Sequence, residues 1–288
     1  MKKLFDLLKQ HRLYLLYMLF DLVRKVTAMT VSRVMGTWIV TLCVTVMAIG
    51  CGGSPTPDEE NRGLLRITEF SVKPDQLAMF EAAWKQNMAR YEQAGSSFGF
   101  SVSVSDSDVY RVVRPMGSWA RFEQYRQEQQ ALPGEFPREA FGDSIDHVRS
   151  SVLRTRQDLN YLPENPRFAG NQLGNEEYGF IKYFFIHTRP GTGQQVADVL
   201  RRMNEVRQRH DVDTPVIVTS SVQYHDGPMV LLRIHFRDVA DSFTHRDEYM
   251  AAMGEEFQVL LDEMSNLARH ITMSNNVVRR DLSYQPAN

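Results

Sequence analysis

One pattern is written twice in this chain, and the distance between its copies is the strongest constraint on the fold. Arg-x-Asp-Leu-x-Tyr-x-Pro starts at Arg156 and again at Arg279. Asp281 therefore follows Asp158 by 123 residues, which is longer than the repeats of solenoid proteins and close to the size of a small domain. The repeat predicts a duplicated domain in which each copy ends with the same segment.

Length and composition are compatible with two such domains. The chain has 288 residues, of which 43% are hydrophobic and 24% charged, enough to bury a core in two units of about 100 to 120 residues. A net charge of −2 gives no electrostatic reason to expect nucleic acid as a partner. Cys43 and Cys51 are the two cysteines, and both precede the predicted domains. A disulfide or a cysteine-ligated metal is therefore excluded within the domains.

The segment before the domains carries a targeting signal. Arg33 precedes an uncharged apolar stretch at 34–50, which ends at Ala48-Ile49-Gly50-Cys51 and continues into a Gly- and Pro-containing tether over 51–63. This resembles the lipobox of bacterial lipoproteins, in which a peptidase cuts before the cysteine and the cysteine is lipidated. The resemblance implies a palmitate-type anchor on Cys51 and membrane attachment at the cell envelope. In a bacterium with two membranes it favours the outer membrane or the periplasmic face.

Two alternatives for this segment stay open. A signal anchor or a plain membrane helix fits an apolar stretch of 17 residues, which is at the short limit for spanning a bilayer. Met29 begins a complete signal-peptide n-region, so translation from Met29 or Met35 would make the preceding residues irrelevant to function. We assign 1–50 to a leader with a lipoprotein signal peptide.

Both halves show the same order of elements: strand, helix, strand, strand, helix, strand. In the first half, 64–72 has strand composition, a helix follows Pro74, and 98–115 alternates like a hairpin. In the second half, 178–188 and 216–236 repeat the strand and the hairpin. We expect each closing helix to carry four apolar residues on one face, and the repeated pattern to form the last strand or an extended tail. The eight residues are Phe141, Ile145, Val148 and Val152 and, 119 positions later, Leu260, Met264, Leu267 and Ile271.

A β-α-β-β-α-β unit is the ferredoxin-like plan, with both helices on one face of the sheet. The other face is apolar here, so two units can cover each other by packing their sheets together. This resembles the dimeric α/β barrel superfamily, which includes antibiotic-biosynthesis monooxygenases and the chlorite dismutase type of haem protein. We predict an α+β protein with ferredoxin-like units at 64–163 and 178–288, joined by a linker at 164–177. The two units would form an intramolecular dimeric α/β barrel.

The resemblance implies a ligand pocket between sheet and helices, so polar and aromatic residues within the strands are the candidates. Lys182, Tyr183, Arg233 and His235 are predicted to line a pocket of the second half for an anionic or quinone-like small molecule. The alternative for each is a place at a strand end, where the side chain reaches water. The matched positions across the halves are Arg66 with Lys182, Glu69 with Phe185, Ser71 with His187, and Arg114 with His235.

No cofactor and no metal site is predicted. The resemblance makes haem the cofactor to weigh, but no motif selects an axial ligand among the four histidines on predicted helices. His225-Asp226 lies in a turn, and neither His-x-x-x-His nor Glu-x-x-His occurs. A phosphate-binding glycine loop and a Gly-x-Ser-x-Gly elbow are also missing from the sequence. The four histidines are His147, His210, His245 and His270.

Two classes of function remain. In the first, a lipid-anchored envelope protein uses the duplicated barrel to bind a small molecule or a partner without catalysis. In the second, a cofactor-free monooxygenase-like enzyme acts on a small aromatic or quinone-like substrate, and a base such as His235 takes a proton from it. Because the sequence offers no paired acid and base, we favour the first class.

Overall fold

The strands of the two halves close into one barrel. The computed structural model describes residues 63–135, 138–167, 178–224 and 226–286, and all of these belong to one structural unit, Pro57–Asn288. Cys51 with its apolar stretch and tether, and most of the predicted linker, lie outside the described residues. Within the described ranges, none of the helices combines the length and the apolar character that a membrane crossing needs.

The elements follow the predicted order in each half. The first half contains β1 (Leu64–Val72), α4 (Leu77–Ala94), β2 (Ser101–Ser105), β3 (Val109–Gly117), α5 (Trp119–Ala131), α6 (Arg138–Ser144) and β4 (Ile145–Thr155). The second half contains β5 (Phe180–Thr188), α7 (Gly193–Arg209), β6 (Val216–Gln223), β7 (Met229–Phe236), α8 (Val239–Leu267) and β8 (Ala268–Val278). Short 3-10 turns at Pro74–Gln76, Gln157–Leu159 and Arg280–Leu282 connect them.

Two seams join the halves into an α+β fold with a closed, antiparallel sheet. Around the barrel the strand order is β1-β3-β2-β8-β5-β7-β6-β4. At one seam Ser105 of β2 lies opposite Asn276 of β8, and at the other Thr155 of β4 lies opposite Thr219 of β6. The predicted sheet-to-sheet barrel is therefore present, and hydrogen-bonded strands connect its two halves.

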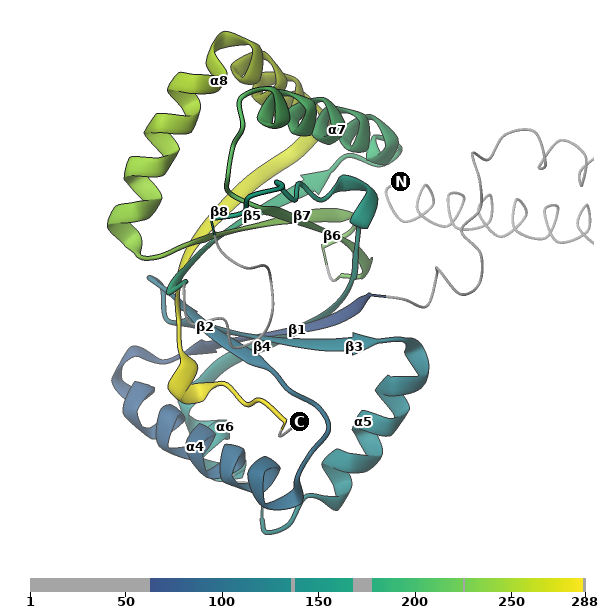
Figure 1. Ribbon diagram of the computed structural model, residues 1–288. Coiled ribbons are helices and arrows are strands. Elements are labelled where there is room, and N and C mark those ends of the chain that lie inside the picture. The colour runs from purple at the N-terminus through teal and green to yellow at the C-terminus, as the bar shows by residue number, and fades with distance from the viewer. Residues whose placement is uncertain (1–62, 136–137, 168–177, 225, 287–288) are drawn as a thin grey trace, which may run out of the picture. The chain divides into compact units, whose positions relative to one another are not determined.

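Helices cover the outside of the barrel in two layers. Figure 1 shows α4, α5 and α6 over the strands of the first half and α7 and α8 over those of the second. Phe80 and Trp84 of α4 are buried against the first sheet, and Val199 and Leu200 of α7 against the second. A separate cluster that includes Tyr183 fills the inside of the barrel. A fourth cluster, which includes Leu64, Met116 and Tyr125, lies in the first half. The described residues thus form four apolar cores, and burying them is the main force that holds the halves in place.

The predicted closing helices are too long in both halves. Helix α6 ends at Ser144, so Ile145, Val148 and Val152 lie on strand β4, and α8 ends at Leu267, so Ile271 lies on β8. Residues four positions apart share a face in a strand as well as in a helix, so the apolar spacing did not decide between them. These residues form a strand because the segment pairs with β1, where Val152 lies opposite Arg66.

The two repeated endings are exchanged between the halves. Tyr161, at the end of the first half, bridges to Val216 of β6, and Tyr284, at the end of the second, bridges to Phe100 of the first. Strand β4 pairs with β6 and β8 pairs with β2, so the chain after each strand continues beside the other half. In Figure 1 the yellow C-terminal segment accordingly lies near α4. Each repeated ending therefore closes the other half of the barrel and not its own.

Candidate functional site

A hollow of about 560 Å³ lies between the first sheet and helix α5. Three of its seven lining residues are aromatic, because α5 contributes Trp119, Phe122 and Tyr125. Trp119 and Phe122 pack with their ring centroids 5.2 Å apart at the rim, where 42% of Trp119 is exposed. The hollow therefore offers planar apolar surface that is open to solvent. Its lining consists of Arg66, Trp119, Phe122, Glu123, Tyr125, Arg126 and Gln129.

A polar network connects two lining residues of this hollow, Tyr125 and Gln129, with Tyr91 and Arg114. The Tyr91 hydroxyl donates to Gln129 Oε1 at 2.7 Å and lies 3.5 Å from the Tyr125 hydroxyl. Arg114 donates from Nη2 to the Tyr91 oxygen at 3.3 Å. Burial raises the pKa of Tyr91 above its ordinary value, although the nearby Arg114 opposes the shift. Tyr91 is therefore protonated at neutral pH and acts as a donor.

The network contains more donors than acceptors. Arg114 Nε and Gln129 Nε2 are buried and have no acceptor among the described residues. Arg66 donates from Nε to Ser150 Oγ at 3.0 Å, and its guanidinium carbon lies 5.8 Å from the Tyr125 ring centroid. Neither Arg66 nor Arg114 forms an ion pair with a carboxylate in the described ranges, so the end of the hollow at Arg66 is electropositive. An acceptor-rich or anionic group matches it.

The predicted counterpart in the second half is closed. Lys182 occupies the place of Arg66, but its ammonium donates to the Ser242 carbonyl at 3.2 Å and lies 4.8 Å from the Phe243 ring centroid, under helix α8. Burial lowers its pKa, and Arg246 adds to the shift. The strand register pairs Lys182 with Ile234 and Arg66 with Arg114. Arg114 therefore matches Ile234, and the predicted match with His235 is wrong.

Three of the four predicted ligand-binding residues gather inside the barrel. Tyr183, Arg233 and His235 point inward, whereas Lys182 points outward because neighbouring strand residues face opposite sides of a sheet. His235 stacks on the ring of Tyr178 with centroids 4.5 Å apart. Tyr183 is 1% exposed and packs with the inner apolar cluster. The predicted four-residue pocket of the second half is therefore not assembled.

His235 has the electrostatics of a neutral, buried imidazole. Burial, and to a smaller extent the charge of Arg233, lower the pKa of His235 to about 3. Burial also lowers the pKa of Arg233, whose Nε has no acceptor among the described residues. A base with so low a pKa is unprotonated at pH 7 but weak. A catalytic role for His235 stays a prediction. The buried position of this residue, stacked on Tyr178, is equally that of a side chain that serves only packing.

An ion pair lies near the middle of the barrel. Arg111 donates from Nε to Glu69 Oε1 at 2.7 Å and from Nη1 to Ser274 Oγ at 2.8 Å and Asn276 Oδ1 at 2.5 Å. Its guanidinium also lies over the Tyr183 ring, 5.4 Å from the centroid. All of these partners are protein groups, so Arg111 joins β1, β3 and β8.

The histidines weighed as haem ligands are scattered. His147 is on strand β4 with Nε2 3.1 Å from Ser71 Oγ, and His270 is on β8, so the predicted helical positions of these two are wrong. His210 ends α7 and is exposed, and His245 on α8 lies 3.9 Å from Asp241. None of the four lines the hollow beside α5. The described residues therefore place no axial histidine there, and the absence of a cofactor stays a prediction.

The sequence analysis matched Arg66 with Lys182 and Arg114 with His235. It did not predict that the two arginines lie near α5. The missing partners are Tyr91, Tyr125 and Gln129, which come from two helices and have no fixed spacing to the strands. One signal was available: Arg66 and Arg114 lie on the strand faces that meet the helices, and most other residues of these faces are apolar. A cation at such a position has to find either a partner or a ligand.

The fold is shared with known proteins, although the sequence is not. No family model and no curated protein match the chain. An anthrone oxidase-like protein of known structure superposes with a TM-score of 0.55, 11% identity and coverage of 77% of this chain and 93% of that one. A proposed monooxygenase (FN1347) from Fusobacterium nucleatum superposes with a TM-score of 0.50, 12% identity and coverage of 76% and 93%. The chain therefore shares its α+β fold with these two proteins.

Proposed function

We propose that the protein binds an aromatic small molecule with an anionic or carbonyl oxygen in the hollow between β1 and α5. The observation that carries this proposal is the Arg66 guanidinium, which lines a hollow together with three aromatic side chains and has no carboxylate partner among the described residues. Arg114 lies over the ring of Tyr125, one of these aromatic residues. Trp119 and Phe122 would stack on the ring system of the ligand. Arg66 would supply the charge that orients its oxygen.

The charge and shape of the hollow set the ligand class. Arg114 already lies over the Tyr125 ring, 4.5 Å from its centroid, which is a cation–π contact. Gln129 adds an amide donor beside it. Fused phenols, quinones and aromatic sulfonates or carboxylates combine a planar surface with acceptor oxygens, whereas cations and plain hydrocarbons lack the acceptor.

The test measures binding of anthraquinone-2-sulfonate to the full chain, purified in non-ionic detergent, through quenching of tryptophan fluorescence. We expect saturable quenching, because Trp119 lines the hollow. Arg66→Met keeps the apolar length and removes the charge, so affinity should fall about tenfold or more, the effect of losing a charged hydrogen bond.

Lys182→Met is the matched control, since Lys182 holds the equivalent place in the second half but is covered by α8. Its affinity should equal that of the wild type. If Arg66→Met binds as tightly as the wild type, the hollow is not the binding site and the proposal is lost. Thermal melts of both variants show whether a change in affinity reflects unfolding.

A second candidate function is cofactor-free oxygenation of the bound molecule. It is favoured by the electropositive end of the hollow and by the fold shared with an anthrone oxidase-like protein and a proposed monooxygenase. With anthrone as substrate, loss of a carbon-bound proton gives an enolate that Arg66 would stabilise. Dioxygen would add to the carbanion to give a hydroperoxide, and loss of water would leave anthraquinone. The net reaction consumes one anthrone and one dioxygen and produces one anthraquinone and one water.

Glu123 is a carboxylate that lines the hollow and is available as the base in such a reaction. Hydrogen bonds from Arg126 and Gln127 lower its pKa, so it is ionised at neutral pH. Oxygen uptake with anthrone, with anthraquinone identified by mass spectrometry, is the test. A rate equal to the uncatalysed one with tight binding of anthraquinone-2-sulfonate would show a binding protein, and a rate lowered by Arg66→Met but not by Lys182→Met would show an enzyme.

We also propose that Cys51 anchors the protein to the cell envelope through a lipid. The support comes from the sequence around Cys51, with its apolar stretch and following tether. Replacement of Cys51 by Ser should leave an unprocessed precursor and abolish labelling by a radioactive fatty acid. Unchanged labelling would refute the anchor. Membrane fractionation then tells whether the protein lies at the outer membrane, as we expect in a bacterium with two membranes.

A further inference from the structure

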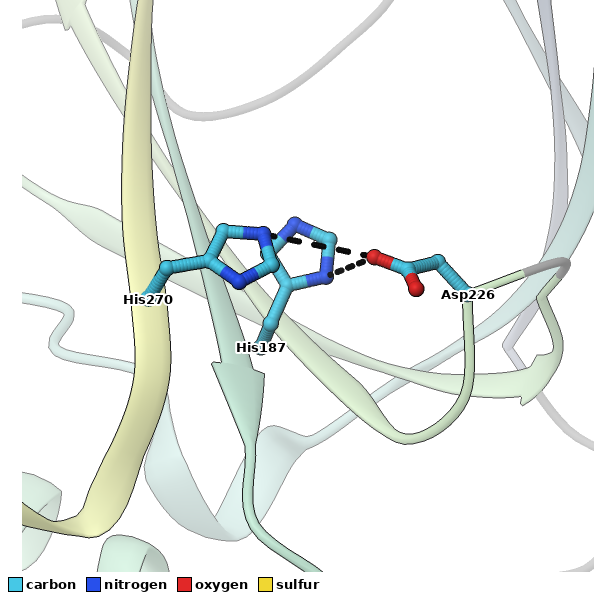
Figure 2. A group of neighbouring side chains, drawn as sticks. All are labelled: His187, Asp226 and His270. Carbon is cyan, nitrogen blue, oxygen red and sulfur yellow. Dashed lines mark ion pairs between the residues drawn. The ribbon is translucent and has the colours of Figure 1, made fainter.

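Two histidines and an aspartate converge at one end of the barrel, in the second half. His187 is on β5 and His270 on β8, and the two are direct partners in the strand register. Asp226 lies in the hairpin between β6 and β7. Figure 2 shows the carboxylate of Asp226 directed at both imidazoles. The three residues are far apart in the sequence, and the closed sheet brings them together.

The ligand atoms are close enough to share one ion. Asp226 Oδ2 lies 3.2 Å from His187 Nδ1 and 4.0 Å from His270 Nε2, and one ligand atom from each of the three residues lies within 4.8 Å of the others. Two atoms at about 2.1 Å from a tetrahedral ion are about 3.4 Å apart. The first pair already has this separation, and rotation of the exposed His270 side chain brings the second pair to it.

We propose that His187, Asp226 and His270 form a binding site for a transition-metal dication of the zinc type. Two imidazole nitrogens and one carboxylate oxygen are typical ligands of Zn²⁺, Co²⁺, Ni²⁺ and Fe²⁺, whereas Mg²⁺ and Ca²⁺ prefer oxygen alone. Three protein ligands leave at least one coordination position for water or a small anion. The site does not depend on the hollow beside α5.

The surroundings hold His187 and Asp226 in place. The imidazole of His187 is buried, with 6% of its side chain exposed. His270 stacks on it at a centroid distance of 3.9 Å and would leave this stack when it turns toward the ion. Arg269 Nη2 lies 3.4 Å from Asp226 Oδ1 and donates to the Asp226 carbonyl at 2.5 Å, so it fixes the hairpin and leaves Oδ2 free to face the imidazoles. Such outer contacts orient metal ligands. The side chains of Asp226 and His270 are 43% and 46% exposed, which gives an ion a way in.

The first half supplies an internal comparison. Ser71 pairs with His147 in the register of β1 and β4, as His187 pairs with His270 in that of β5 and β8. Ser71 and His147 form a hydrogen bond of 3.1 Å instead of a stacked imidazole pair. The duplication therefore placed a serine where the second half has its buried histidine, and only the second half has two imidazoles at this position.

The test uses the full chain without a polyhistidine tag, stripped of metal with a chelator and kept in non-ionic detergent. Calorimetric titration with Zn²⁺ should show one ion bound per chain, and Co²⁺ should give the visible absorption of a nitrogen- and oxygen-ligated ion. Asp226→Asn and His270→Ala, both at exposed positions, should each weaken binding at least tenfold. His147→Ala, the matched control, should bind as the wild type does, and Mg²⁺ should not compete.

A thermal melt separates loss of the site from loss of the fold. Zn²⁺ should raise the melting temperature of the wild type and of His147→Ala, because an ion that binds the folded state stabilises it, and it should not raise that of His270→Ala. The melting temperatures without metal should agree within a few degrees. Equal Zn²⁺ affinity of wild type and His270→Ala, or no binding by the wild type at micromolar concentrations, would overturn the proposal.

Discussion

Tyr161 and Tyr284 occupy exchanged places in the two halves. Tyr161 donates its hydroxyl to the Val212 carbonyl of the second half at 2.6 Å, and Tyr284 donates to the Ser96 carbonyl of the first half at 3.0 Å. Both rings are buried, at 7% and 6% exposure. The repeated ending is therefore a reciprocal clasp, in which each half of the barrel is completed by a segment of the other.

Removing either tyrosine ring should destabilise the whole barrel. Tyr284→Ala and Tyr161→Ala are each expected to cost about 2 to 4 kcal/mol in the free energy of unfolding, because a buried aromatic side chain is lost. Phenylalanine at the same positions removes only the hydroxyl and should cost about 1 kcal/mol. Urea denaturation measures both. Leu162→Ala is the control, since this neighbour is 63% exposed and should change little.

The clasp also predicts cooperative unfolding. Trp84 of the first half donates to the Leu282 carbonyl of the second ending at 2.8 Å, and Asn204 of the second half donates to the Leu159 carbonyl of the first at 2.9 Å. Each ending ties the two halves together, so damage to one ending should lower the melting temperature of both halves in a single transition. A variant of Tyr284 in which one half melts before the other would contradict this prediction.

Acid should destabilise the protein because it weakens the hydrogen bonds of Arg279, in the second ending, to two carboxylates. Arg279 binds Glu81 Oε2 of α4 at 2.7 Å and Asp281 Oδ1 at 2.8 Å. These hydrogen bonds lower the pKa of both carboxyl groups below their ordinary values. A carboxyl group with a lowered pKa in the folded state stabilises the protein above its unfolded pKa and loses this contribution as pH falls. Stability should therefore decline below about pH 4.5.

Glu81→Gln tests this assignment. The variant cannot ionise at this position, so its stability at pH 7 should be lower than that of the wild type and should fall less between pH 5 and pH 3. Unfolding in urea at several pH values gives both quantities. Glu92→Gln is the matched control, because Glu92 is an exposed residue of the same helix. Identical pH profiles for the wild type and Glu81→Gln would rule out a role for this pair.

The sequence predicted the topology because the repeat, the turns and the strand alternation agree with each other in both halves. It misplaced the boundary between α6 and β4 because residues four apart, such as Val148 and Val152, fit a helix and a strand equally. It placed Lys182 and Tyr183 in one pocket although strand neighbours face opposite sides, an error that the period of two could have prevented. Only the packing of the helices determines that the hollow beside α5 is open and that the equivalent place in the second half is covered by α8.

The two sites escaped sequence reasoning for a different reason. Gln129, Tyr91 and Arg114 come from three separate elements, and His187, Asp226 and His270 from two strands and a hairpin. No local spacing links them, and motif searches depend on local spacing. The search for His-x-x-x-His was bound to miss a pair that meets across neighbouring strands. Such sites become visible only when the strand register is known.

His235 should resist protonation through the ordinary range of histidine titration. Its burial, with Arg233 nearby, lowers its pKa to about 3, so its ring resonances should stay constant between pH 8 and pH 4 in nuclear magnetic resonance spectra. In urea the same ring should titrate near pH 6.5. The folded protein binds the proton of His235 more weakly than the unfolded chain does. Protonation below the pKa of the unfolded chain therefore favours unfolding, and stability should decrease from about pH 6.5 downward. His235→Phe should remove that part of the decrease, and a titration of His235 near pH 6 in the folded protein would contradict the prediction.

Lys182 and Arg66 hold equivalent places in the two halves, but only Arg66 lines an open hollow. The ammonium of Lys182 is covered by α8 and touches Phe236 and Phe243, with a carbonyl as its hydrogen-bond acceptor. Burial disfavours the charged form, so a lowered pKa means that stability rises as pH increases through the lysine range. Lys182→Met should therefore change the free energy of unfolding by less than about 1 kcal/mol at pH 7, since a buried charge and an apolar chain of similar size are exchanged. Because Lys182 lies under α8 and not in the open hollow, binding of anthraquinone-2-sulfonate should be the same in this variant and the wild type. A tenfold loss of affinity in Lys182→Met would show instead that the second half opens to bind the ligand.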